Sequence, residues 1–150
     1  MSLTGHILVV DDDAAIRTVV GEALRCAGHE VRTVDTLAAM QAQLQTGFGE
    51  VLITDVMLPD GNGLDLVPDI LGAHPRLPVI VLSAQNTLST AVRATEQGAF
   101  EYLPKPFDLD ELTRAVADAL AVVRRFDDRG GDAGPAATDD PMAWAEGAQP

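Results

Sequence analysis

Between residues 6 and 125, short apolar runs alternate five times with segments of helical periodicity. This alternation is typical of a parallel sheet whose strands are joined by crossover helices. The expected strands lie at 6–10, 30–34, 50–54, 78–83 and 100–103. The expected helices follow at 14–27, 37–46, 64–73, 87–97 and 109–125. The pattern therefore predicts one α/β domain made of five strand–helix units.

The composition of the runs predicts the order of the strands. Continuous apolar runs at 7–10, 51–53 and 79–82 suit central strands that helices cover on both faces. The runs at 31–34 and 100–103 include polar residues and suit edge strands. The flavodoxin-like order 2-1-3-4-5 satisfies both conditions in a doubly wound parallel sheet. Its switch point between strands one and three places a ligand at the carboxyl ends of the strands.

Polar side chains follow the carboxyl ends of four of these strands. They are Asp11, Asp12, Asp13, Asp55, Ser83 and Lys105. Carboxylates held close together raise one another's pKa unless a cation neutralises them. Oxygen-only ligands favour Mg²⁺, Mn²⁺ or Ca²⁺ over zinc, and a site with few protein ligands and several waters is typical of Mg²⁺. Asp13 is better explained as the N-cap of the first helix.

Lys105 is the only lysine in a chain with nine arginines. Its compact ammonium can contact a carboxylate or phosphate oxygen where a wide guanidinium does not fit. Pro104 and Pro106 stiffen the turn around it, and the Lys105–Pro106 bond is a candidate for the cis form. These features favour a site lysine over a solvated surface lysine.

Four motifs at the strand ends together resemble the receiver domain of bacterial two-component response regulators. They are Asp11-Asp12, Asp55 followed by Met57-Leu58-Pro59, Ser83-Ala84 and Lys105-Pro106, and the resemblance spans residues 6 to about 123. The stretches 5–13 and 98–108 further resemble the receivers of nitrogen-regulation (NtrC-type) activators. One departure is Asp60-Gly61-Asn62-Gly63, which replaces the more usual Gly-x-Asp-Gly and predicts a looser loop after Asp55.

The resemblance implies a role for each of these residues. Asp55 would accept a phosphoryl group from a sensor histidine kinase, and Lys105 and Mg²⁺ would neutralise charge on the phosphoryl oxygens. Asp11, Asp12, Asp55 and the backbone carbonyl of Met57 would hold the metal. Ser83 would hydrogen-bond the phosphate, and Tyr102 matches an aromatic position whose rotamer follows that contact. Self-phosphotransfer and autodephosphorylation would be the only reactions, so the chain is not expected to be an enzyme.

The fourth predicted helix has few large apolar residues and is rich in threonine and serine, so we expect weak anchoring. The fifth repeats apolar residues at helical spacing and should pack firmly. The expected output surface therefore comprises the fourth helix, the fifth strand and the adjoining edge of the fifth helix. The resemblance implies control of transcription through ATPase and DNA-binding domains that lie outside this chain, and it is compatible with a homodimer.

Charge and composition limit the partners and the compartment that are expected for this chain. Acidic residues outnumber basic ones 23 to 10, so the chain itself should not bind nucleic acid. Its longest apolar runs are too short to span a bilayer, and its single cysteine, Cys26, suggests a reducing compartment, with the cytoplasm as the default. Residues 4–125 form the expected receiver domain. Residues 126–150 are rich in acids, Gly, Ala and Pro, a composition that predicts a disordered linker.

Three other functions compete with the receiver. Asp11-x-Asp13 after a first strand also resembles phosphatases of the haloacid dehalogenase type, although Ala14-Ala15 stands where these usually carry a hydroxyl residue. A flavin-binding module is disfavoured because three aspartates would repel a phosphate. A non-phosphorylated interaction module on the same fold is disfavoured by the complete set of polar residues.

Overall fold

The computed structural model describes residues 4–84 and 87–133. Its centre is a five-stranded parallel sheet of order β2-β1-β3-β6-β7. The strands are β1 (His6–Val10), β2 (Glu30–Val34), β3 (Val51–Asp55), β6 (Val79–Ser83) and β7 (Glu101–Pro104). In chain order these are the five predicted strands, and the flavodoxin-like order 2-1-3-4-5 is confirmed.

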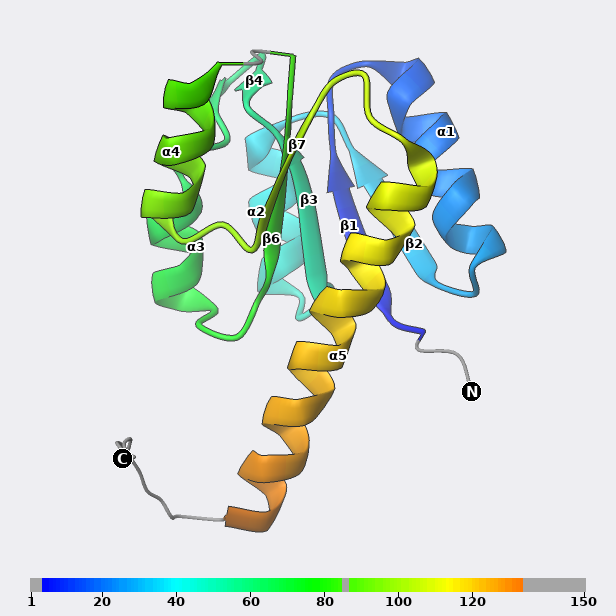
Figure 1. The fold of residues 1–150 in the computed structure, drawn as a ribbon, viewed down its shortest axis with the longest axis vertical. Helices are drawn as coiled ribbons and strands as arrows, with labels where there is room; N and C mark the ends of the chain where they lie inside the picture. Colours follow the sequence, from blue (N-terminus) through cyan, green and yellow to red (C-terminus); the bar gives the residue numbers. More distant parts are fainter. Residues whose placement is uncertain (1–3, 85–86, 134–150) are drawn as a thin grey trace.

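Helices cover both faces of the sheet (Figure 1). One face carries α1 (Ala14–Cys26) and α5 (Leu109–Ala133), and the other carries α2 (Leu37–Gln45), α3 (Val67–Ala73) and α4 (Leu88–Gln97). Across the described ranges, no helix combines the length and apolar character that crossing a bilayer requires.

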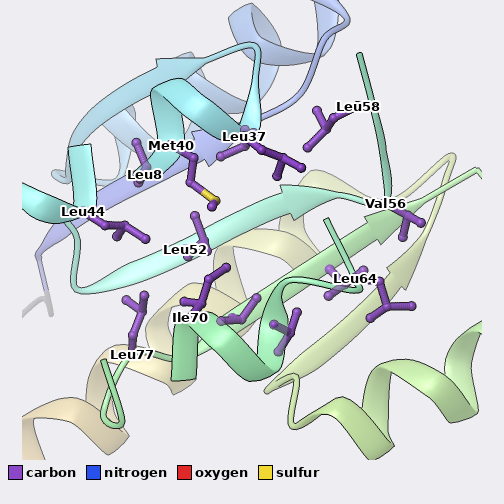
Figure 2. Close-up of a cluster of buried hydrophobic side chains, with 14 of the residues drawn as sticks. Leu8, Leu37, Met40, Leu44, Leu52, Val56, Leu58, Leu64, Ile70 and Leu77 are labelled. Carbon is purple, nitrogen blue, oxygen red and sulfur yellow. The ribbon is translucent and has the colours of Figure 1, made fainter. Parts of the chain in front are cut away.

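The alternation of side chains along each strand divides the core into two layers. In β1, Ile7 and Val9 pack with α1 and α5, whereas Leu8 and Val10 pack with α2 and α3. Figure 2 shows the second layer, where Leu8 and Leu52 of the sheet meet Met40 of α2. All residues of β3 and β6 are buried, and the edge strands β2 and β7 are partly exposed, as their composition predicted.

Anchoring differs sharply between α4 and α5. Only Thr90 and Ala94 of α4 are buried, and its largest apolar side chain, Leu88, is 81% exposed. In α5, Leu112, Val116 and Leu120 are fully buried. The expected contrast between a loosely held fourth helix and a firmly packed fifth helix is therefore present in the packing.

α5 is longer than the sequence indicated. The predicted helix ended at 125 and a disordered linker began at 126, but the helix continues to Ala133, beyond the edge of the sheet (Figure 1). The reason is that residues 126–133 contain no proline, and a helix that is already packed extends at little cost. The rest of the predicted linker, 134–150, lies outside the described residues.

A short antiparallel hairpin that the sequence did not indicate follows β3. Its strands are β4 (Met57–Leu58) and β5 (Gly61–Asn62). The Asn62 side chain accepts hydrogen bonds from the amides of Leu64 at 2.8 Å and Asp65 at 3.2 Å. The expectation of a loose loop was wrong, because backbone pairing and side-chain hydrogen bonds hold this segment.

Candidate functional site

Three carboxylates meet at the carboxyl ends of the two central strands β1 and β3. Asp11 follows β1 and is fully buried, Asp55 ends β3 and is 7% exposed, and Asp12 is exposed. One carboxylate oxygen from each lies within 4.8 Å of the others. The parallel pairing of β1 with β3 produces this cluster, because it brings the ends of the two strands side by side.

Lys105 reaches the same cluster from the turn after β7. Its Nζ donates to Oδ2 of Asp11 at 2.8 Å and to Oδ2 of Asp55 at 3.2 Å. The turn is fixed by the Lys105 amide, which donates to the carbonyl of Ser83 at 2.7 Å, and the Lys105–Pro106 bond is cis. The lysine side chain is 17% exposed, so one largely buried cation bridges two buried anions.

The charges in this cluster shift one another's titration. Burial raises the pKa of the Asp55 carboxyl, and the negative charge of Asp11 raises it further, against the opposing effect of Lys105. Burial lowers the pKa of Lys105, but its hydrogen bond to Asp11 and the charges of both carboxylates outweigh burial and raise it overall. Three carboxylates against one ammonium leave an excess of negative charge that favours a cation.

Asp13 stands apart from the cluster. Its Oδ1 accepts hydrogen bonds from the amides of Ala15 at 2.9 Å and Ile16 at 3.4 Å, which makes it the N-cap of α1 as predicted. The carboxylate group identified among the described residues is Asp11, Asp12 and Asp55, without Asp13. An Asp11-x-Asp13 pair of the phosphatase type is therefore not supported by this geometry.

The other residues predicted for the site are Ser83, Met57 and Tyr102. Ser83 ends β6, next to β3, and is 1% exposed. Met57 begins β4, two residues after Asp55, and is 57% exposed. Tyr102 lies on β7, half-buried against the core layer under α2, α3 and α4.

The sequence reasoning missed Arg17, whose guanidinium donates to the backbone carbonyl of Asp11 at 2.6 Å. The contact fixes the backbone that carries the buried carboxylate. Only its position gives a signal in the sequence. Arg17 lies in the first turns of the helix that follows the acidic run, and a side chain there can reach back to the end of the strand.

The donor set fits a hard divalent cation. All three candidate ligands are carboxylate oxygens, two of them on strand ends that the sheet holds fixed. Mg²⁺ uses one or two carboxylates with several waters, whereas zinc sites draw on His and Cys. Asp11, Asp12 and Asp55 could therefore hold Mg²⁺ without rearrangement of the sheet.

Comparison with known proteins identifies the family of this chain. Residues 7–117 match the family model described as the response regulator receiver domain. The DNA-binding transcriptional regulator NtrC of Azospirillum brasilense is 58% identical over 114 residues, which are 76% of this chain and 24% of that protein. NtrC of Bradyrhizobium sp. is 56% identical over 117 residues, 78% of this chain and again 24% of the relative. The chain thus spans about a quarter of the length of these curated relatives.

Solved structures give the same answer for the fold. The beryllofluoride-activated NtrC4 receiver domain dimer superposes with a TM-score of 0.74 at 31% identity, covering 78% of this chain and 97% of that one. NtrX from Brucella abortus superposes with a TM-score of 0.77 at 32% identity, covering 91% of this chain and 31% of that one. The chain belongs to the response regulator receiver domain family, and its receiver is of the NtrC type.

Proposed function

We propose that this receiver accepts a phosphoryl group on Asp55 in the presence of Mg²⁺ and passes the signal to an output domain through its α4–β7–α5 face. The observation that carries the proposal is the Lys105 ammonium, which contacts both Asp11 and Asp55 at the centre of the carboxylate cluster. An ammonium fixed against a buried carboxylate is the arrangement that can receive the negative oxygens of a transferred phosphoryl group.

Transfer then uses the residues of this chain in distinct roles. A carboxylate oxygen of Asp55 attacks the phosphorus of a phosphohistidine on a sensor kinase, and the phosphorus–nitrogen bond breaks with its electron pair remaining on the imidazole. Lys105 moves from carboxylate to phosphoryl oxygens, and the Ser83 hydroxyl donates to one of them. Asp11, Asp12, Asp55 and the Met57 carbonyl would hold Mg²⁺, which would neutralise charge on the phosphoryl oxygens.

The added phosphate carries about −1.5 to −2 charges and biases the element held least firmly. α4 fits this description because only Thr90 and Ala94 are buried and Leu88 and Val92 face solvent. Tyr102, half-buried on the neighbouring strand, is the aromatic switch that follows Ser83. Water later hydrolyses the aspartyl phosphate in the same site, which regenerates the Asp55 carboxylate and releases inorganic phosphate.

The setting of the domain is inferred from its relatives. The NtrC relatives are DNA-binding transcriptional regulators, and the NtrC4 receiver is described as a dimer. We infer that a cytoplasmic histidine kinase pathway of nitrogen regulation acts on this receiver. Its output is transcription through ATPase and DNA-binding domains beyond this segment, and its active form is a homodimer.

The test is the intact mass of the chain after incubation with acetyl phosphate, a small phosphodonor. We expect one phosphoryl group to be gained with Mg²⁺ present and none with EDTA, because the acidic cluster repels the donor until a cation is bound. The matched control is Asp55→Asn, which keeps the shape of the side chain. Undiminished labelling of this variant would refute Asp55 as the acceptor.

A further inference from the structure

The side chain of Asp60 ties the loop after Asp55 to the start of α2. Its Oδ1 accepts a hydrogen bond from the amide of Leu37 at 2.9 Å, and its Oδ2 accepts one from the amide of Ala38 at 3.0 Å. These amides belong to the first turn of α2 and have no partner within the helix. The two hydrogen bonds hold the pKa of Asp60 below its ordinary value, so the carboxylate is charged where it meets the helix.

Two apolar contacts hold the same hairpin against α2. A Cβ atom at Gly61 would lie only 3.0 Å from Cδ1 of Leu37, so the turn of the hairpin rests directly on that side chain. Leu58 is 8% exposed and shares a core cluster with Leu37 (Figure 2). The hairpin is thus attached to α2 by a charged contact and by apolar packing.

The end of the hairpin opposite its turn adjoins the carboxylate cluster. Met57, whose carbonyl is the proposed fourth metal ligand, is paired with Asn62 across the hairpin. The amide of Gly63 donates to the carbonyl of Val56 at 2.7 Å, next to Asp55. A shift of the hairpin relative to α2 therefore displaces the backbone at Met57, while the strand ends that carry Asp11 and Asp55 stay in the sheet.

We infer that Asp60 is a positioning residue for the metal site: by anchoring the hairpin to the first turn of α2, it fixes the Met57 carbonyl in place for a divalent cation. This inference rests on the proposed function. The usual glycine at this position of the family loop has no side chain with which to make either hydrogen bond. This anchoring of the hairpin is therefore available only to receivers that carry an acidic residue here.

The experiment compares Mg²⁺ affinity in the full chain and in three variants by isothermal titration calorimetry. Asp60→Ala removes both hydrogen bonds, and we expect binding about tenfold weaker, at the low end of what the loss of an outer-shell contact costs. Asp60→Asn keeps one acceptor oxygen and should bind with intermediate affinity. The matched control is Thr36→Ala, since Thr36 caps the same helix through the amide of Ala39 at 3.1 Å, an amide that Asp60 does not use.

The four affinities separate the possible causes. Weaker Mg²⁺ binding in both Asp60 variants, with unchanged binding in Thr36→Ala, supports the inference. Equal losses in Asp60→Ala and Thr36→Ala, or no loss in either Asp60 variant, overturn it while the proposed function stands. Absence of Mg²⁺ binding in the unmodified chain would instead refute the proposed function. If Asp60→Ala does not fold, Asp60→Asn against Thr36→Ala gives the same decision.

Discussion

The ammonium nitrogen of Lys105 lies 3.2 Å from Oδ2 of Asp55, although 50 positions of the chain separate the two residues. The sheet brings them together, since β6 stands between β3 and β7. Lys105 thus links Asp55 to the turn that leads from β7 into α5. A change in charge at Asp55 is therefore expected to alter its contact with the Lys105 ammonium.

Replacement of Lys105 by arginine tests this link. Arg keeps the charge, but its planar fork has a different reach and shape from a compact ammonium. We expect Lys105→Arg to fold normally and to lose most of the change in amide exchange that beryllofluoride, a phosphoryl analogue, produces over residues 87–103. The reciprocal change at an exposed position of α5, Arg125→Lys, should leave the response intact. A normal response of Lys105→Arg would show that the shape of the cation is unimportant.

Acid should weaken a second cluster, at the opposite end of the sheet. Glu50 accepts a hydrogen bond from the amide of His6 at 3.0 Å and pairs with Arg124 of α5. Burial raises the pKa of Glu50, but these contacts and the His6 side chain outweigh burial and lower it below its ordinary value. A depressed carboxyl pKa stabilises the fold above the unfolded-state value, and this stabilisation is lost as pH falls through the folded-state value.

Glu50→Gln should therefore unfold at lower urea concentration than the unmodified chain at pH 7, and the two midpoints should converge as the pH falls below the ordinary pKa of a glutamate and through the lowered pKa of Glu50. The control is Glu96→Gln on the exposed side of α4, which should show no such convergence. A difference between Glu50→Gln and the unmodified chain that persists unchanged at pH 3 would mean that packing, and not charge, explains the effect.

The sequence was sufficient wherever a pattern repeated or a strand end carried an unusual residue. Continuous apolar runs identified β3 and β6 as central, and the strand order they predicted already placed Asp11, Asp55 and Lys105 at one edge. The hairpin was missed because strands of two residues are too short for alternation to appear. Asp60 was treated as part of a loose loop because its partners, Leu37 and Ala38, lie more than 20 positions earlier.

Close packing around Gly63 gives a further prediction. A Cβ atom at this position would lie 2.3 Å from the backbone carbonyl oxygen of Asp55 and 2.8 Å from Oγ1 of Thr54. Because backbone atoms cannot yield as a flexible side chain does, Gly63→Ala should lose about 1–3 kcal/mol of unfolding free energy. It should also bind Mg²⁺ more weakly, since the backbone of Asp55 must shift.

The matched control for Gly63 is Gly72, which lies in α3 with open space where an added Cβ atom would stand. Gly72→Ala should gain roughly 0.5–1 kcal/mol, because alanine loses less entropy than glycine in a helix. Urea unfolding measures directly whether each variant is less or more stable than the unmodified chain. Equal effects at both positions would contradict the close approach of Gly63 to Asp55.

The last prediction separates the metal ligand from the helix cap among the adjacent aspartates. At about ten times its Kd, Mg²⁺ should stabilise the unmodified chain by roughly 1.4 kcal/mol, because it binds only the folded arrangement. For a domain of this size, that is a rise in melting temperature of about 3–8 °C. Asp12→Ala removes one carboxylate of the cluster, so it should melt higher than the unmodified chain in EDTA and respond little to Mg²⁺.

Asp13→Ala provides the contrast. It loses the side-chain hydrogen bonds to the amides of Ala15 and Ile16, which should cost about 1 kcal/mol. The Asp13 amide still donates to Oδ1 of Asp11, since that contact uses the backbone, so the Mg²⁺ response should be retained. If Asp13→Ala abolishes the response, or Asp12→Ala keeps it in full, then the second metal-binding acid is Asp13. The site would then be built on Asp11-x-Asp13, as in the phosphatases that share this pattern.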